Sequence, residues 1–470
     1  MKHRTLYSIA VVLIVSSGCF GANEAGVGLT IYNDNFAVVR EARNMKFEKG
    51  QNTVRVTDVA SAIDPTSVKF TCLSAPGAVS VLEQNYEYDL VNADSLLKRY
   101  IDKQVMVALK GSGSDSGKSV EGTLLAAVGQ DLIVKGSNGI EVIGRAGVEE
   151  IKLKELPEDL VTRPTLVWLA QAGKAGEQLC EVAYTTGAIG WKADYTAVLN
   201  ADDTALDFSG WVTIGNQSGA GYKDATLKLI AGNVRRIQPP APMTMGVVRM
   251  ALADKSMAGE GFEEKPFMEY HMYTLGRKST INNNQVKQIE FIEPAEGVKA
   301  KKIFVYDRGS GWYSEDSQGK GKVNVKIEFE NKKENKMGIA LPKGKVRVFK
   351  KDPADNSLQF VGEDEIDHTP KDEKLSLYIG DAFDIVAEHT LVDSKHERRM
   401  ARETHKVELR NRKEQAVTIF VDEHIPAWVN WTIDPTTHKY INKDAHTARF
   451  EVTVEANATA TVQYTVTQTW

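Results

Sequence analysis

Hydrophobic and polar residues alternate with a period of two along most of the chain, in short runs that end at glycine, asparagine or aspartate. The runs are rich in valine, threonine, isoleucine and tyrosine, which is typical of antiparallel sheets with one buried face. They occur at residues 28–32, 37–41, 52–56, 67–73, 79–82, 206–216, 226–230, 323–330, 346–349, 405–410, 416–421, 448–454 and 460–467. Strands do not alternate with long helical patterns, so we expect a mainly β, multi-domain fold of antiparallel β-sandwiches rather than a doubly wound parallel sheet.

One helix is predicted at residues 94–100, with Asn92 or Asp94 able to cap its free N–H groups. Five short strand-like runs follow it, at residues 103–109, 120–127, 131–135, 140–144 and 148–153. Tight turn sequences separate these runs and predict a small barrel of the SH3-like or Sm-like kind at residues 93–157. Strand-rich sequence then resumes, so we expect this barrel to be inserted into an N-terminal β-sandwich built from residues 27–90 and 160–236.

Residues 237–266 have a different composition. They contain Pro239, Pro240 and Pro242, four methionines and little strand periodicity. A Met-x-Met sequence without nearby histidine or cysteine is a weak signal for Cu(I), so a flexible linker is the favoured interpretation. The remaining residues, 267–470, are expected to form the C-terminal β-sandwich region.

The N-terminal residues have the anatomy of a secretory signal peptide. Lys2 and Arg4 precede an apolar stretch at residues 6–15, and small residues follow up to Ala22. This order predicts a signal peptide at residues 1–22 and an exported protein of the periplasm or the outer cell envelope. No later stretch is apolar enough to cross a bilayer, so no transmembrane span is expected after signal removal.

Cys19 allows two outcomes for this segment. Ser16-Ser17-Gly18-Cys19 resembles a bacterial lipobox, with serine where leucine is usual. Cys19 is therefore a candidate lipidation site that would anchor the protein to a membrane. The alternative is cleavage near Gly21, which would release a soluble protein.

The composition bears on two questions, namely whether the protein binds nucleic acid and whether its cysteines form disulfides. The chain has 470 residues, 42% of them hydrophobic, and a formal net charge of −5, which gives no reason to expect a nucleic-acid partner. Three cysteines exclude a disulfide scaffold. After signal removal Cys72 and Cys180 remain, and they can form a disulfide in an oxidising compartment or serve as small buried apolar side chains.

Three segments resemble functional motifs but lack an essential part. Residues 111–119 lack the first glycine of a phosphate loop, and Ser95 with Lys98 lacks the companion motifs of a serine–lysine nucleophile. Residues 352–363 lack the glycine and one oxygen ligand of an EF-hand. A hairpin connection, a helix surface and a hairpin loop are expected instead, so the sequence predicts no catalytic residue and no cofactor.

The histidines are the remaining candidates for a metal site. Eight of nine lie between His271 and His446, but none forms the close-spaced pair common in zinc sites. Strand alternation leaves Glu269 with His271, and Asp422 with His424, as pairs that share a face. Surface and turn positions explain most of these residues, and no metal site is predicted.

A basic stretch in the C-terminal part of the chain is a candidate binding surface. Residues 395–414 carry eight lysines and arginines against four glutamates. They can face an anionic glycan or a membrane surface, although the solvated face of long strands is the more common explanation.

Trp191, Tyr195 and Trp211 are expected to pack between sheets, with their N–H or O–H groups hydrogen-bonded.

Several sequence blocks resemble a bacterial family related to mucoidy-inhibitor proteins, whose members share a C-terminal domain of unknown function, number 4139. The resembling blocks are residues 29–33, 63–68, 83–86, 190–195, 211–213, 216–219, 231–234, 269–271, 287–289, 341–348, 366–370 and 380–384. The resemblance covers nearly the whole chain after Gly28. It implies an exported, mainly β envelope protein, and it assigns no catalytic or ligand-binding residue.

The expected function is therefore a non-enzymatic binding or structural role in the cell envelope, with an envelope protein or a surface glycan as partner. The alternative is a hydrolase of envelope glycan or peptide that uses carboxylates or a histidine-assisted metal. Elemental analysis separates the two, because stoichiometric zinc or another transition metal would favour the enzyme.

Overall fold

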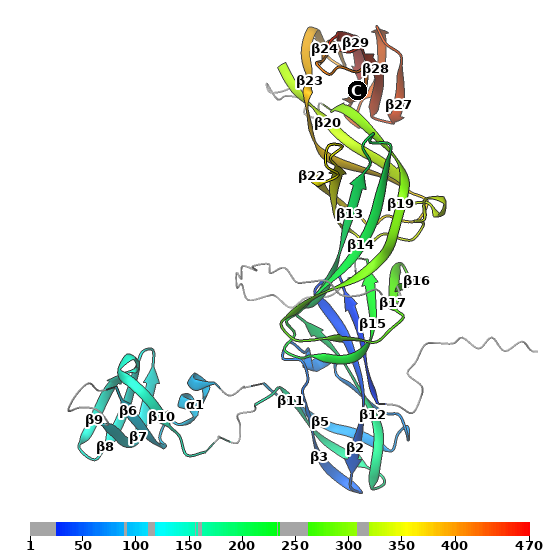
Figure 1. The fold of residues 1–470 in the computed structure, drawn as a ribbon. Coiled ribbons are helices and arrows are strands. Elements are labelled where there is room, and N and C mark those ends of the chain that lie inside the picture. The colour runs from blue at the N-terminus through cyan, green and yellow to red at the C-terminus, as the bar shows by residue number, and fades with distance from the viewer. Residues whose placement is uncertain are drawn as a thin grey trace, which may run out of the picture. The chain divides into compact units, whose positions relative to one another are not determined.

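The computed structural model describes residues 25–88, 92–110, 118–155, 157, 162–232, 234–235, 262–307 and 319–470. The described chain consists mainly of β-strands arranged in several sheets, which confirms the predicted fold class (Figure 1). The predicted signal peptide, with Cys19, and most of the predicted linker at 237–266 lie outside the described residues. No helix among those described is long and apolar enough to cross a membrane.

The chain divides into two compact units. Unit 1 comprises Met1–Gly190, Gly215–Lys228 and Lys278–Val286, and unit 2 comprises Trp191–Ile214, Leu229–Arg277 and Lys287–Trp470.

Unit 1 contains two sheets that form a sandwich. The first has the strand order β15 (Tyr222–Ala231), β1 (Gly26–Tyr32), β2 (Phe36–Phe47), β12 (Gly176–Gly187) and β4 (Lys69–Cys72), with β18 (Ser279–Ile281) paired to β15. The second has the order β3 (Gly50–Thr57), β11 (Thr165–Ala172) and β5 (Val79–Glu87). Phe70 of β4 packs edge-on against Trp168 of β11, with ring centroids 5.3 Å apart, and this contact joins the two sheets.

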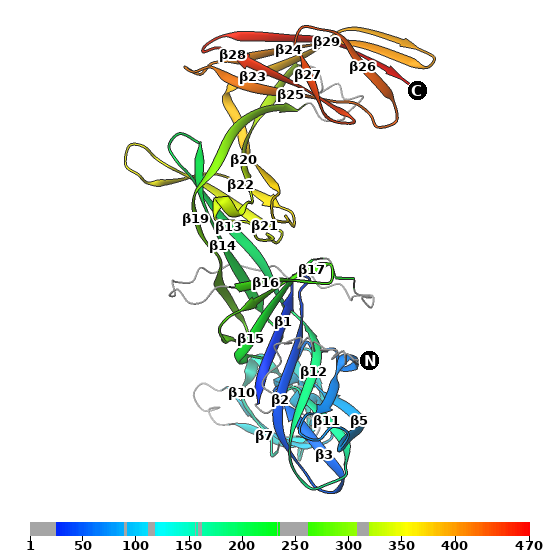
Figure 2. The ribbon, with the colours of Figure 1, turned by 90° about the vertical axis from the view of Figure 1, so that its right-hand side faces the viewer.

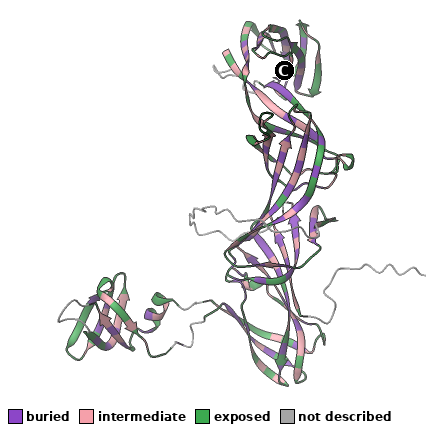
Figure 3. Cartoon of the chain, viewed as in Figure 1, coloured by how far each residue is buried: buried purple, intermediate pink, exposed green. Residues whose placement is uncertain are grey.

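The strands bury alternate residues, as a sandwich requires. Along β12 every second residue from Cys180 to Thr186 is buried, while the residues between them are only partly covered. Figure 3 shows the same alternation of buried and exposed positions along many strands. Burial of one side-chain set per strand is the main source of the stability of such a sheet pair.

An inserted module lies between β5 and β11. It consists of α1 (Ala93–Arg99), β6 (Gln104–Leu109), β7 (Ser119–Val128), β8 (Asp131–Gly136), β9 (Gly139–Gly144) and β10 (Val148–Lys152). The predicted helix is confirmed, with Asn92 as its N-cap, because the Asn92 side chain accepts a hydrogen bond from the Ser95 N–H (2.8 Å). Leu97 and Tyr100 pack with Val107, Leu124 and other strand residues in a separate hydrophobic core.

The five predicted strands of this module are confirmed, and their pairing does not close into a complete barrel. The strand order is β10-β6-β7-β8-β9, so the described sheet ends in two edge strands that do not pair with each other. After β9 the chain passes through a short 3-10 segment, Arg145–Gly147, into β10, which pairs with β6. The module is therefore an open five-stranded antiparallel sheet with one helix.

Unit 2 is built around one large sheet. Its order is β22 (Leu358–Ile366), β21 (Gly344–Lys351), β13 (Ile189–Leu199), β14 (Ala205–Asn216), β19 (Gln285–Asp307), β20 (Gly319–Glu330), β23 (Lys374–Glu397), β24 (Met400–Asn411), β29 (Thr459–Thr469) and β26 (Asn430–Thr436). Off this path, β25 (Val417–His424) pairs with β19 and β28 (Thr447–Val454), and β27 (Tyr440–Asp444) pairs with β28. The hairpin of β16 (Phe262–Phe267) and β17 (Tyr270–Leu275) is not part of this large sheet. Two pairings, β13 with β21 and β19 with β25, are parallel, which corrects the expectation of purely antiparallel sheets.

The last strands of unit 2 enclose a hydrophobic core of their own. Ile385, Val407 and Val462 come from β23, β24 and β29, and they share this core with Val421 and Phe450 from β25 and β28. Figure 2 shows these strands together at the C-terminal end of the chain, with the C-terminus beside β26. We call this part the C-terminal sandwich.

Candidate functional site

Two tryptophans lie together on the surface of the C-terminal sandwich. Trp428 lies in the connection between β25 and β26, and Trp470 follows β29. Their rings pack edge-on with centroids 5.8 Å apart, and 56% and 44% of the two residues' surfaces remain exposed. Pairing of β26 with β29 places the two connections at the same end of the sheet.

Three arginines accompany this tryptophan pair. Arg398 and Arg399 form the turn between β23 and β24, and the Trp470 N–H donates a hydrogen bond to the carbonyl oxygen of Arg399 (3.2 Å). Arg402 lies on β24 opposite Thr467 of β29. All three arginines are exposed, and none forms an ion pair with another residue in the described part of the chain.

These five residues, Trp428, Trp470, Arg398, Arg399 and Arg402, are called the Trp–Arg surface below. A guanidinium group binds carboxylate or sulfate oxygens through two parallel hydrogen bonds. An exposed indole ring offers a flat apolar face with a polar N–H group. The surface therefore has the groups needed to bind an anionic ligand that also carries apolar C–H faces.

A row of polar side chains runs from the β23–β24 hairpin, whose turn contains Arg398 and Arg399, to the core of the C-terminal sandwich. His396 Nε2 lies 3.5 Å from Glu403 Oε1, and His405 Nε2 lies 3.5 Å from Glu403 Oε2. His405 Nδ1 is 3.0 Å from His389 Nε2, and both of these rings are buried. Pairing of β23 with β24 brings these four residues together, and Ser394 extends the row to the surface through a 2.8 Å contact with His396 Nε2.

A second buried pair lies next to this row. The Tyr464 hydroxyl donates a hydrogen bond to Glu423 Oε2 (2.6 Å), and the rings of Tyr464 and His405 are 5.4 Å apart. Within the described ranges, no three histidine, cysteine, aspartate or glutamate side chains are grouped so that they could hold a metal ion. The contacts of these groups instead link neighbouring strands.

The two residue pairs that the sequence places on common faces do not act together. His271 Nδ1 lies 2.8 Å from Glu264 of the paired strand β16, whereas Glu269 lies exposed in the β16–β17 turn. The register of the hairpin, rather than alternation within one strand, selects the partner of His271.

Asp422 and His424 also have separate partners. Asp422 is 1% exposed and accepts two hydrogen bonds from Arg449, at 2.6 and 2.7 Å, and one from Lys443 at 3.0 Å. His424 Nε2 lies 3.0 Å from Asp307 Oδ1. Asp422 therefore anchors two cations from the neighbouring strands β27 and β28.

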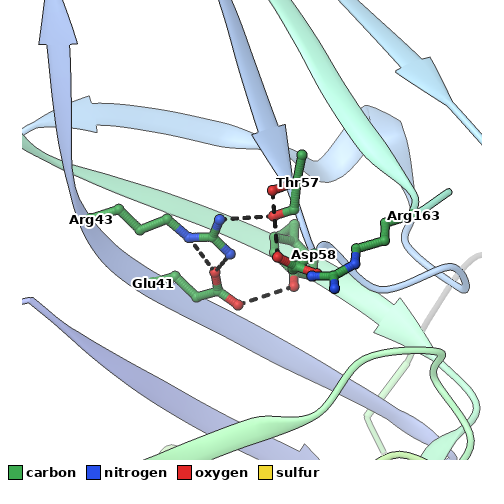
Figure 4. A network of polar contacts seen from close by, with 6 residues as sticks. Glu41, Arg43, Thr57, Asp58 and Arg163 are labelled. Atoms are coloured by element: carbon green, nitrogen blue, oxygen red, sulfur yellow. Dashed lines mark hydrogen bonds and ion pairs between the residues drawn. The ribbon is translucent and has the colours of Figure 1, made fainter. Parts of the chain in front are cut away.

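Unit 1 contains a polar network around the buried carboxylate of Glu41 (Figure 4). Arg43 Nε donates to Glu41 Oε2 (2.7 Å), and Arg43 Nη1 donates to the carbonyl oxygen of Thr57 (2.8 Å). Beside it, Arg163 forms an exposed ion pair with Asp58 (2.7 Å). Arg43 thus links β2 to the end of β3, which belongs to the facing sheet.

The network continues into the interior through hydroxyl groups. The Tyr184 hydroxyl donates to Glu41 Oε1 at 3.5 Å, and Tyr222 shares a 3.2 Å hydrogen bond with Ser218. Ser218 in turn donates to Asn216 Oδ1 (2.7 Å). Burial raises the pKa of Tyr222 to about 12 and that of Tyr184 well above its usual value, so both hydroxyls stay protonated at neutral pH.

The segments that resembled catalytic motifs have the expected structural roles. Residues 352–363 lie in the hairpin formed by β21 and β22. Ser95 and Lys98 lie on α1, with Lys98 exposed. Most of the glycine-rich segment, residues 111–117, lies outside the described residues, but the strands on either side of it, β6 and β7, form an antiparallel pair.

Two of the three predicted aromatic packing residues are confirmed. Trp191 and Tyr195 are buried, and they donate hydrogen bonds to the carbonyl oxygens of Ile230 (3.3 Å) and Pro342 (2.8 Å). The prediction for Trp211 is wrong, because its side chain is 38% exposed. It lies between the buried residues Gly210 and Val212 of β14, so strand alternation directs it outward.

Sequence reasoning did not identify Trp428, the Glu41 network or the His389–His405 contact. The basic run at 395–414 was the one sequence signal for the Trp–Arg surface, and it contains all three of its arginines.

Comparison with known proteins assigns this chain to a family. No curated protein matches the chain. Residues 180–470 match the family described as "Domain of unknown function (DUF4139)". The match begins in β12 and includes the whole Trp–Arg surface, whereas the inserted module precedes it. Since this region covers more than half of the sequence, the chain belongs to the DUF4139 family.

Proposed function

We propose that this protein is an exported cell-envelope protein with a non-enzymatic role, and that it binds an anionic glycan at the Trp–Arg surface. One observation carries the proposal: two exposed tryptophan rings lie in contact with each other beside three exposed arginines that have no ion-pair partner among the described residues. Acidic sugars present both matching chemistries, since they carry carboxylates and flat faces of C–H groups.

The surrounding charges support an anionic ligand. Most other basic side chains of this stretch have partners: Lys395 with Glu397 (2.7 Å), Lys406 with Glu408 (2.7 Å) and Arg410 with Glu388 (2.6 Å). The arginines of the Trp–Arg surface therefore retain positive charge for a ligand, while those further along β24 are balanced within the protein.

The location is part of the same proposal. Lys2 and Arg4, the apolar stretch at 6–15 and the small residues up to Ala22 support a cleaved signal peptide and an envelope location. A relation to mucoidy-inhibitor proteins, expected from the sequence blocks, is also proposed. The alternative is an envelope hydrolase, which would cleave the glycan that it binds. The binding experiment can therefore also measure cleavage of the oligosaccharide.

Calorimetric titration of the purified protein with oligogalacturonate, a linear acidic oligosaccharide, tests the proposal. Uncharged maltoheptaose serves as the ligand control. We expect saturable binding of oligogalacturonate that weakens as salt is added, and much weaker binding of maltoheptaose. The Trp428→Ala variant should bind at least about tenfold more weakly, because it loses one of the two aromatic contacts.

Trp211→Ala is the matched control, since it removes an exposed tryptophan of unit 2 that lies outside the Trp–Arg surface. Its affinity should equal that of the wild type. Absence of oligogalacturonate binding, or equal losses in both tryptophan variants, would contradict the proposal. Shorter oligosaccharides appearing during the titration would favour the hydrolase.

A further inference from the structure

Cys72 and Cys180 face each other across two neighbouring strands of unit 1. β4 pairs with β12 in an antiparallel register that places Cys72 directly opposite Cys180. Both cysteines carry free thiols and are buried, with 3% and 0% of their surface exposed. The two residues come from distant parts of the sequence, and the inserted module lies between them.

The hydrogen bonds of these strands show which kind of pair the cysteines form. The Leu73 N–H donates to the carbonyl oxygen of Leu179 (2.8 Å), so these two residues form a hydrogen-bonded pair. Such pairs alternate along an antiparallel ladder with pairs that are not hydrogen-bonded, and Cys72–Cys180 is the next pair. In pairs of this second kind the Cα atoms lie about 4.5 Å apart, which is within the range of about 4.4–6.8 Å found in disulfides.

The surroundings of Cys180 keep its thiol protonated. Burial raises the pKa of the Cys180 thiol to about 12, and the neighbouring Cys72 adds to this rise. Because the thiolate is the reactive form, Cys180 is poorly reactive while the strand stays closed. Reaction therefore requires local opening of β4.

β4 is suited to such opening. It has only four residues and ends the strand order of its sheet. Short edge strands open with a smaller free-energy cost than central strands do. An opened β4 exposes both cysteines to a soluble reagent, and reclosing brings the two sulfur atoms together again.

We propose that Cys72 and Cys180 form a redox site, which closes a reversible disulfide between β4 and β12 when the protein meets a disulfide-bearing oxidant. One cysteine thiolate attacks the S–S bond of the oxidant, releases one thiol and remains as a mixed disulfide. The second cysteine attacks the protein sulfur of that bond, forms the Cys72–Cys180 bond and releases the second thiol. Two electrons pass to the oxidant, and the two cysteine protons end on its thiols.

The disulfide would link the edge strand β4 covalently to its neighbour β12. It closes a loop that contains the whole inserted module, and closing a long loop restricts the unfolded chain strongly. The oxidised protein is therefore expected to unfold at a temperature several degrees higher than the reduced protein. This inference does not depend on the proposed glycan binding.

Incubation of the folded full-length protein with oxidised glutathione, followed by alkylation and peptide mapping, tests the inference. We expect one cross-linked peptide pair that contains Cys72 and Cys180, a mass loss of two hydrogens, and recovery of both thiols on adding dithiothreitol. The Cys19→Ser variant should give the same result, since Cys19 takes no part.

Cys180→Ser is the matched control for stability. Its unfolding temperature should not respond to the oxidant, whereas that of the wild type should rise. Stable mixed disulfides with glutathione on Cys72 or Cys180, or thiols that stay reduced although the urea-unfolded chain reacts, would overturn the inference.

Discussion

Asp422 shows how a single buried charge is held in the C-terminal sandwich. Burial alone raises the pKa of this carboxyl group, but the hydrogen bonds and charges of Arg449 and Lys443 outweigh that effect and lower the pKa below its usual value. Asp422 is therefore ionised at neutral pH. Its two partners come from β28 and β27, so the carboxylate holds three strands together.

The Asp422→Asn variant should lose about 3 kcal/mol of unfolding free energy at neutral pH, because it leaves a partly buried arginine without its partner. In the wild type, the contribution of this group is present above the ordinary aspartate pKa and disappears as the pH falls through the lowered folded value. Urea unfolding at pH 7 and near pH 3 measures both effects. The difference between variant and wild type should shrink in acid.

Glu408→Gln provides the comparison, because it breaks the partly exposed pair with Lys406 on the same sandwich. Its loss should be clearly smaller than that of Asp422→Asn. Equal losses in the two variants, or a loss at Asp422 that does not depend on pH, would contradict the assigned role.

At the scale of elements, the parallel pairing of β13 with β21 depends on a close approach of two backbones. Gly344 lies opposite Ala193 in this pairing. A Cβ atom added to Gly344 would lie 2.3 Å from the carbonyl oxygen of Ala193 and 3.0 Å from the Tyr195 ring. A side chain at this position would therefore force the two strands apart.

The Gly344→Ala variant should destabilise unit 2 by about 1–3 kcal/mol, the usual cost of overpacking in a well-packed interior. Thermal unfolding followed by tryptophan fluorescence measures the change. Gly215→Ala is the control, since an added Cβ there meets nothing within 4 Å and Gly215 also lies in a strand. A Gly344→Ala protein as stable as the control would show that the strands separate without cost.

Local sequence patterns predict helices and strands better than they predict which strands pair with each other. The helix at 94–100, with Asn92 or Asp94 as its cap, and the five strands after it follow from neighbouring residues. The structure confirms the helix and the strands, and of the two candidate caps it has Asn92. Parallel pairing of β13 with β21 has no local signal, because the partner strand lies far away in the sequence. Trp211 fails for a related reason: its hydrophobicity favours burial, but the alternation of β14 directs it outward.

The same reasoning explains what the sequence reveals of the Trp–Arg surface. The excess of basic residues at 395–414 is visible in the sequence and predicts a charged surface. Its association with Trp428 and Trp470 depends on the pairing of β24, β29 and β26, which period-two alternation does not specify. Sequence patterns therefore identify the charge but not the aromatic contact.

At the scale of the whole molecule, the location of the protein is a prediction from its first residues. Intact-mass measurement of the protein from its native host should show that about the first twenty residues are missing. Added lipid mass on an N-terminal Cys19 would indicate a membrane-anchored protein, and an unmodified N-terminus beyond Cys19 a soluble one. A mass that retains residues 1–18 would contradict export.

Amide hydrogen exchange of the full-length protein, with and without oligogalacturonate, shows whether a glycan binds at the Trp–Arg surface. When the oligosaccharide is bound, exchange should slow in peptides covering residues 397–403, 426–431 and 465–470. Peptides of unit 1 should be unchanged. Protection at another surface, or none at saturating oligogalacturonate, would contradict the claim.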